Sequence, residues 1–275
     1  EKHIGFPMCF LFTKTKNNQY YEIGNNSCLI SNYLGANMHI LELTGVDLTY
    51  FSTQGETKAL NDITFSVDRG DFVSIVGPSG CGKTTILSLI TGLIKPTHGT
   101  IAINSDDHKK VGYMFQKDNL LEWRTIQNNI YLGLELTHTK TKDNLDYVDN
   151  LLKKYNLWDF RNKFPRELSG GMRQRCALIR TLALNPDILV LDEPFSALDY
   201  QTRITVSDDV YNIIKEEKKT ALMVSHDIGE AIAMSDKVIV LSKRPCIVKK
   251  IYDINLKKKS TPSENRKDGS FTVEK

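Results

Sequence analysis

One loop of eight residues carries the clearest chemistry in the chain. Residues 77–84 are GPSGCGKT and match the pattern G-x-x-x-x-G-K-[ST] in full. Glycines let the backbone curl so that N–H groups face phosphate oxygens, and a helix starting near Lys83 adds the positive end of its dipole. Lys83 is then placed to hold the β- and γ-phosphates of a nucleoside triphosphate, and the Thr84 hydroxyl to coordinate Mg²⁺, which leaves kinases, GTPases, helicases and transport ATPases open. The expected contact residues are Gly77, Pro78, Ser79, Gly80, Cys81, Gly82, Lys83, Thr84 and Thr85.

Two adjacent carboxylates follow an apolar segment later in the chain. Residues 188–191 are ILVL, and Asp192 and Glu193 come directly after them. We expect Asp192 to hold Mg²⁺ through water, and Glu193 to polarise the water molecule that attacks the terminal phosphate. That role fits hydrolysis better than phosphate transfer to a second substrate. The alternative is structural, with Asp192 capping the next turn.

A Ser-Gly-Gly turn opens a third functional segment. Residues 168–175 are LSGGMRQR. Taken alone, Ser169 is a helix N-cap followed by flexible glycines. In order with the other motifs, the segment resembles the LSGGQ signature of the ABC ATPase family, with Met172 where that family usually has Gln. The resemblance implies that Ser169, Gly170 and Gly171 contact phosphate.

The resemblance covers residues 41–256 and implies further roles. Gln116 matches the Q-loop glutamine, which senses Mg²⁺ and the attacking water and links the site to a permease. Asp199, at the end of the segment Ser-Ala-Leu-Asp, matches the D-loop, and His226 matches the switch histidine that contacts the γ-phosphate. A lone Gln or His is more often structural, but the ordered set favours the functional interpretation. The expected catalytic residues are Glu193, His226 and Gln116, and the expected metal contacts are Thr84, Gln116 and Asp192.

The resemblance also implies an aromatic residue that stacks on adenine. Tyr50 matches this position best, and the neighbouring Phe51 is the alternative.

A single chain carries only one set of these motifs. In the family, ATP lies between two nucleotide-binding domains arranged head to tail, so Ser169 of one copy serves the site that Lys83 and Glu193 build in the other. We therefore expect a second nucleotide-binding subunit, as a homodimer or with a paralogue as the alternative.

Hydrophobic periodicity predicts the elements that position these residues. Residues 41–50 and 63–67 alternate apolar and polar side chains, as in an antiparallel sheet. Four apolar runs fit buried strands: 72–76, 188–191, 221–224 and 238–241. Because helical stretches separate these runs, the core is expected to be a mainly parallel α/β sheet. Residues 117–169 are nearly all helical in pattern and predict an inserted α-helical subdomain.

The expected fold class is therefore α/β, and the resemblance adds that the core is a RecA-like P-loop NTPase core with an antiparallel β layer. The polar, aperiodic residues 1–38 predict an N-terminal extension. Residues 39–256 form the expected ABC ATPase domain. The Lys- and Ser-rich residues 257–275 predict a flexible tail.

Composition limits the remaining classes. The 275 residues carry a net charge of +3, too little to indicate a nucleic-acid binder, so no nucleic acid is expected. No apolar run approaches the roughly 20 residues of a membrane-spanning helix, and no signal peptide is recognisable. The five scattered cysteines form no CxxC pair, which favours reduced thiols in the cytosol.

Two segments resemble a particular group of importers. Residues 115–125 and 241–248 are similar to segments of importers of nitrate, sulfonate, taurine and pyrimidine precursors, with Glu122 in place of Pro and Cys246 in place of Gly. Neither the long coiled coil of repair ATPases nor the second domain of translation factors fits in these 275 residues, so transport is the expected function.

The importer resemblance implies particular partners and a location. The partners are a transmembrane permease, docked near residues 118–123, and a solute-binding protein. The location is the cytoplasmic face of the membrane, as a peripheral subunit. Packing is the alternative role for Trp123, and a soluble ABC-type ATPase acting on a ribosome or nucleic-acid complex is the alternative function. The solute itself cannot be inferred, because its contacts lie on other subunits.

Overall fold

The computed structural model describes residues 12–14, 20–22, 39–53, 55–105, 111–255 and 260–267. The chain divides into two compact units, Glu1–Met38 and His39–Lys275. In the first unit, β1 (Phe12–Lys14) and β2 (Tyr20–Glu22) pair as antiparallel strands. The rest of the expected N-terminal extension lies outside the described residues, as do Cys9 and Cys28.

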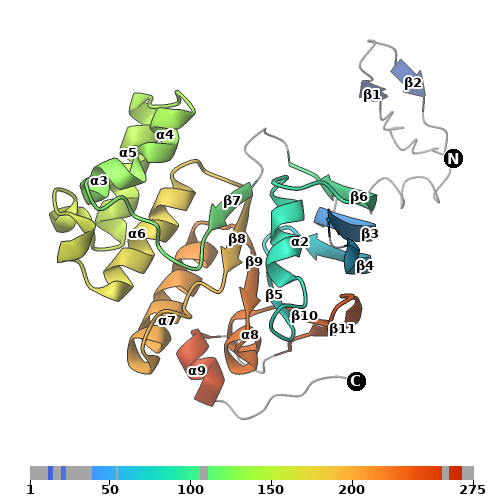
Figure 1. Cartoon of the computed structure of the whole chain (residues 1–275). Coiled ribbons are helices and arrows are strands. Elements are labelled where there is room, and N and C mark those ends of the chain that lie inside the picture. The colour runs from blue at the N-terminus through green and yellow to red at the C-terminus, as the bar shows by residue number, and fades with distance from the viewer. Residues whose placement is uncertain are drawn as a thin grey trace, which may run out of the picture. The chain divides into compact units, whose positions relative to one another are not determined.

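The second unit is built on a six-stranded sheet with the order β11-β10-β5-β9-β8-β7 (Figure 1). Its strands are β5 (Phe72–Val76), β7 (Val111–Met114), β8 (Ile188–Asp192), β9 (Thr220–Ser225), β10 (Lys237–Leu241) and β11 (Val248–Asp253). Only β11 is antiparallel to its neighbour. Parallel strands end at the same edge of a sheet, so the loops after β5, β8 and β9 meet there. The predicted parallel core is confirmed.

Alternate side chains of the central strands face different layers. Ile188 and Val190 of β8 pack with α2 (Lys83–Ile90) and the antiparallel sheet. Leu189 and Leu191 pack with α6 (Gly170–Leu182) and α7 (Tyr200–Glu216) on the other face. Because both faces are covered, the strand is continuously apolar in sequence.

The predicted antiparallel layer is also confirmed. It has the order β4-β3-β6, formed by β3 (His39–Ser52), β4 (Gly55–Asp68) and β6 (His98–Ile103). Leu41 and Leu43 of β3 lie two residues apart and are fully buried, and Val46 is buried as well because the strand pairing shifts its register between Leu43 and Val46.

Helices occupy the region between β7 and α6, seen at the left of Figure 1. They are α3 (Ile126–Ile130), α4 (Leu132–Leu136), α5 (Lys142–Lys154) and the short 3₁₀ helices η1 (Trp158–Phe160) and η2 (Pro165–Glu167). Val148, Leu151 and Leu152 form the buried stripe of α5. Trp123 does not pack inside this region, because 75% of its surface is exposed.

One expectation about the C-terminal end is wrong. Within residues 257–275, expected to be a flexible tail, the structure forms α9 (Pro262–Lys267), which packs against α7 and α8 (Ile228–Met234). The Asn265 side chain is buried and donates a hydrogen bond to the Ala233 carbonyl at 2.8 Å. The Ser263 N–H donates to an Asp208 carboxylate oxygen at 2.8 Å. These polar contacts are long-range, so hydrophobic periodicity gave no sign of them.

Candidate functional site

The phosphate-binding loop connects β5 to α2, and the ammonium group of Lys83 lies within this loop. The Lys83 side chain is only 7% exposed, and its Nζ donates to the carbonyls of Gly77 at 2.9 Å and Pro78 at 3.1 Å. An ammonium has three N–H donors, so one is left for an anion. Gly82 has a φ of 125°, and a Cβ there would lie 2.9 Å from Leu60 Cδ2. Glycine is therefore required at this position for both backbone and packing reasons.

A cavity of about 220 Å³ opens over the loop. Its walls are Ser79, Gly80, Gly82, Lys83, Thr84, Thr85, Glu193 and Arg244. Seven of these residues were expected from the sequence. Arg244 was not, because it lies far along the chain in the connection from β10 to β11.

Thr84 and Asp192 form an oxygen-rich pair at the edge of the phosphate loop. The Thr84 hydroxyl donates to Asp192 Oδ1 at 3.4 Å, and the Tyr113 hydroxyl donates to Asp192 Oδ2 at 2.9 Å. Burial raises the pKa of Asp192, and the nearby Glu193 charge adds to this, although both hydrogen bonds oppose it. A hydroxyl and a carboxylate this close are the hard oxygen ligands that Mg²⁺ prefers. The pair therefore fits the metal that the sequence implies.

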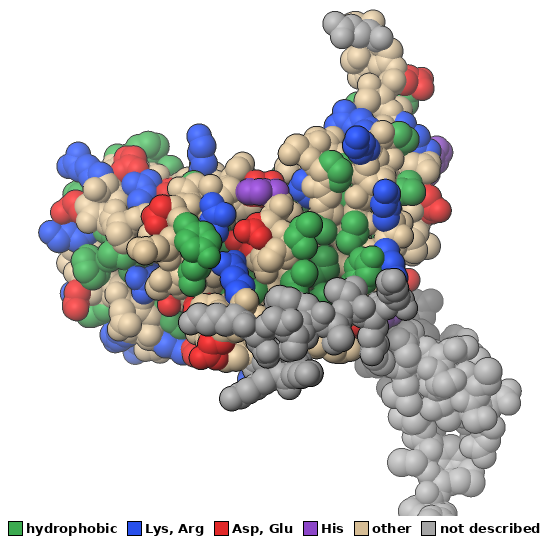
Figure 2. Space-filling view, turned by 90° about the horizontal axis from the view of Figure 1, so that it is seen from below, with side chains coloured by type: hydrophobic (Ala, Val, Ile, Leu, Met, Phe, Trp, Pro, Cys, Tyr) green, Lys and Arg blue, Asp and Glu red, His purple; other side chains and the backbone are tan. Residues whose placement is uncertain are grey.

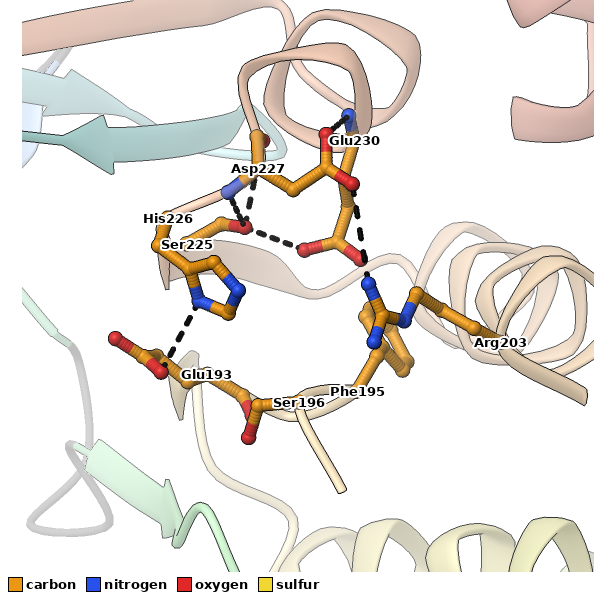
Figure 3. A pocket seen from close by; sticks show the side chains of 8 residues that line it. All are labelled: Glu193, Phe195, Ser196, Arg203, Ser225, His226, Asp227 and Glu230. Atoms are coloured by element: carbon orange, nitrogen blue, oxygen red, sulfur yellow. Dashed lines mark hydrogen bonds and ion pairs between the residues drawn. The ribbon is translucent and has the colours of Figure 1, made fainter. Parts of the chain in front are cut away.

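Three predicted residues converge beyond the end of β8. The Glu193 carboxylate lies 3.2 Å from His226 Nδ1 and accepts a hydrogen bond from Gln116 Nε2 at 3.5 Å. Figure 3 shows His226 pointing across its cavity toward Glu193. The Glu193 backbone is left-handed, with a φ of 45°. Such a conformation costs about 1–3 kcal/mol and is concentrated at functional sites.

A buried polar cluster supports the loop that carries His226 (Figure 3). The Ser225 hydroxyl donates to the Glu230 carboxylate, and the Glu230 N–H donates to Asp227 Oδ1 at 3.0 Å. Burial raises the pKa of Glu230, whose side chain is almost wholly inside the protein. Sequence reasoning missed this cluster and Tyr113. An acidic residue on a helix directly after the switch histidine was the available signal for Glu230.

The Ser-Gly-Gly segment lies at a different cavity. Ser169 Oγ accepts a hydrogen bond from the Met172 N–H at 3.3 Å, so this residue is the N-cap of α6 as well as an exposed polar group. It lines a groove of about 480 Å³ together with Gly170, Gly171 and Asp199. No residue of that groove lines the cavity over the phosphate loop. Within the described residues of one chain, the two halves of the expected site are therefore separate.

The aromatic candidates differ in their surroundings. The Tyr50 hydroxyl lies 3.5 Å from Thr85 Oγ1 at the phosphate loop. Phe51 is the next residue of β3, and its side chain is 69% exposed. Successive strand residues point to opposite faces, so Phe51 faces away from Thr85.

The fold and the loop geometry define a P-loop NTPase, and comparison with known proteins gives the family. The ABC transporter family matches residues 60–196. The ABC transporter ATP-binding protein YtlC of Bacillus subtilis is 48% identical over 222 residues, covering 79% of this chain and 85% of that protein. An aliphatic sulfonates import ATP-binding protein of Bacillus thuringiensis is 39% identical over 212 residues, covering 75% of this chain and 83% of that protein. A nitrate import ATP-binding protein of Synechocystis is 38% identical over 236 residues, covering 83% of this chain and 87% of that protein.

Solved structures agree with this assignment. An ATP-binding cassette in a dimeric post-hydrolysis state, bound to ADP and phosphate, is 33% identical with a TM-score of 0.65, and the match covers 78% of this chain and 98% of that one. The chain belongs to the ABC transporter family, as an ATP-binding subunit with ATPase activity. None of its described helices is both long and apolar enough to cross a bilayer.

Proposed function

We propose that this chain hydrolyses ATP to drive solute import through a separate membrane permease. The observation that carries the proposal is the convergence of Lys83, Thr84, Asp192, Glu193 and His226, from three loops, on one edge of the parallel sheet. The relatives named for sulfonate and nitrate import support a solute of the nitrate, sulfonate, taurine or pyrimidine-precursor type. No observation on the described residues favours a soluble regulator of ribosomes or nucleic acids.

Each side chain has a role that follows from its position. Lys83 and the loop N–H groups bind the phosphates, and Tyr50 stacks on adenine. Glu193 orients and polarises water for attack on the γ-phosphorus, whose bond to the bridging oxygen breaks to give ADP and phosphate. His226 and Gln116 contact the Glu193 carboxylate and position it relative to the γ-phosphate. Mg²⁺, held by Thr84 and Asp192, would neutralise charge on the triphosphate when bound.

A second copy completes the site in this proposal. Ser169, Gly170, Gly171 and Asp199 would contact the ATP held by the partner copy. Their position in a separate groove supports this arrangement, because they cannot be lining residues of their own chain's phosphate cavity.

The permease would dock beside the Q-loop. A groove of about 500 Å³ there is lined in part by Gln116, Asp118 and Arg173, and the exposed Trp123 follows it in the chain. Arg173 donates a hydrogen bond of 2.8 Å to Asp118.

On the face shown in Figure 2, basic and acidic side chains are interspersed, with hydrophobic side chains in small groups among them. Such a surface suits a peripheral subunit on the cytoplasmic side, with a solute-binding protein outside.

Purification of the tagged chain from detergent-solubilised membranes tests the proposal. We expect a permease to co-purify, and the reconstituted complex to take up solute only with ATP inside. The Lys83→Ala complex is the matched control and should assemble without hydrolysing ATP. Absence of any membrane partner, or wild-type hydrolysis by Lys83→Ala, would contradict the proposed function.

A further inference from the structure

The connection between β10 and β11 brings an arginine to the phosphate cavity. Arg244 lines the cavity of about 220 Å³ together with Lys83 and Thr85. Its Nη2 donates a hydrogen bond to the Gly80 carbonyl, at the tip of the phosphate loop, at 3.1 Å. β10 lies directly beside β5 in the sheet (Figure 1), so the loop after it ends next to the loop after β5.

This connection is fixed to the protein at several points. The Cys246 N–H donates to the Ala59 carbonyl at 2.9 Å, and the Cys246 carbonyl accepts from the Asn61 N–H at 2.8 Å. The Cys246 side chain is fully buried beneath the loop. Ser242 Oγ accepts from the Ile247 N–H at 2.9 Å and so closes the turn. Arg244 therefore projects from a well-anchored turn rather than from a loose surface loop.

The charge of Arg244 is not balanced by the protein around it. Across the described residues, no carboxylate lies within 4.0 Å of its guanidinium, and its hydrogen bond to the Gly80 carbonyl uses a single N–H of five. Lys83, the other cation at this cavity, is buried among backbone carbonyls. Arg244 is exposed and faces the same space. With Glu193 as the carboxylate among its walls, the cavity has two cations and one anion, and this excess of positive charge fits an anion with several charged oxygens.

We propose that Arg244 is a second cationic ligand for the phosphate chain of the bound nucleotide, acting beside Lys83. Its planar fork matches a pair of phosphate oxygens, which an ammonium cannot contact in the same way. The hydrogen bond to the Gly80 carbonyl holds the Arg244 side chain over the phosphate loop before the nucleotide binds. The inference rests on the proposed phosphate site and adds to it a residue that its sequence motif does not contain.

Three substitutions vary the charge and the length of this side chain. In Arg244→Ala the charge and the hydrogen-bonding group are both lost. In Arg244→Gln the charge is lost and a shorter neutral amide remains. In Arg244→Lys the charge remains and the fork is lost. Lys243→Ala is the matched control, since Lys243 is exposed on the same turn and does not line the cavity.

Titration calorimetry with MgATP and MgADP measures the effect on the full chain. We expect Ala and Gln at position 244 to weaken both nucleotides about 10- to 100-fold, the loss for one charge-assisted hydrogen bond. Arg244→Lys should fall between these variants and the wild type, because the charge remains but the fork is lost, and Lys243→Ala should retain all of the affinity. Wild-type affinity in Arg244→Gln would show that the charge of Arg244 is not needed, and wild-type affinity in Arg244→Ala would remove the residue from the site; either overturns the inference.

Lys83→Ala distinguishes this inference from the proposed function. If Lys83→Ala loses ATP binding and Arg244→Ala does not, only the role of Arg244 is wrong. If both variants bind ATP as the wild type does, the phosphate site itself is misplaced and both proposals fail.

Discussion

Replacing Asp192 with asparagine should stabilise the nucleotide-free protein while disabling the site. The Asp192 carboxylate accepts hydrogen bonds from Tyr113 and Thr84. Asparagine has nearly the same shape, and its oxygen can still accept from Tyr113 while its amide can donate to Thr84 Oγ1. The substitution therefore removes the charge and keeps the contacts.

The direction of the effect follows from the pKa of Asp192, which burial raises. A carboxyl with a raised folded-state pKa lowers the stability of the fold at any pH where it is ionised. We therefore expect Asp192→Asn to raise the free energy of unfolding of the nucleotide-free protein at neutral pH. For a domain of this size, each kcal/mol gained raises Tm by roughly 2–4 °C. The gain should shrink as the pH falls below the folded-state pKa, and vanish below the ordinary value of 3.8.

Thermal unfolding with and without MgATP measures both halves of this prediction. MgATP at 100 times its Kd should stabilise the wild type by about 2.7 kcal/mol. The Asp192→Asn variant should gain much less, because its metal-holding carboxylate is missing, so the order of stabilities reverses. Asp209→Asn, a change at another carboxyl whose pKa burial raises, should keep the full MgATP gain. An Asp192→Asn variant that is less stable than the wild type without nucleotide, or gains as much from MgATP, would refute the reasoning.

Two further predictions concern the switch histidine and the antiparallel layer. His226→Ala should lower kcat about 100-fold with little change in the Kd for ATP, because His226 contacts Glu193 and, in the proposed mechanism, meets only the γ-phosphate of the nucleotide; an equal loss of ADP affinity in calorimetry would contradict this. Gly99→Ala should lower the free energy of unfolding by more than about 2 kcal/mol in urea titrations, since Gly99 has a φ of 82° and an added Cβ would lie 2.2 Å from the Gly45 carbonyl oxygen. Gly92→Ala, with a φ of 74° and open space around the added Cβ, should lose only about 1 kcal/mol from strain, and equal losses in the two variants would be evidence against the clash.

Local patterns predicted much of the fold. The phosphate loop is a contiguous segment whose chemistry depends on its own backbone, so its residues could be named from the sequence. The continuous apolar run of β8 predicted a buried strand, and the packing of Ile188 and Leu189 in different hydrophobic layers agrees with it. The helix expected to start near Lys83 begins there and ends at Ile90, before Gly92, which has a left-handed φ of 74°.

Residues that reach the site from distant segments could not be found in this way. Tyr113, Glu230 and Arg244 act through contacts with groups elsewhere in the fold, and no local spacing marks them. Arg244 lies in residues 241–248, whose resemblance to importers assigns it no role at the phosphate site. The roles of Gln116 and Ser169 stay predictions, although the structure gives each a position suited to its role.

The most direct test of the shared ATP site is the oligomeric state of Glu193→Gln. Glutamine keeps the shape of the side chain but not the carboxylate that polarises water, so ATP should remain uncleaved between two copies. Size-exclusion chromatography of the isolated subunit should then show an ATP-dependent dimer that ADP does not produce. In the permease complex, the two nucleotide-binding domains should likewise close with ATP and not with ADP. Adding Ser169→Arg should abolish it by crowding the γ-phosphate. Nucleotide-binding domains that stay apart in saturating ATP in both preparations, or hydrolysis at the wild-type rate, would contradict the account.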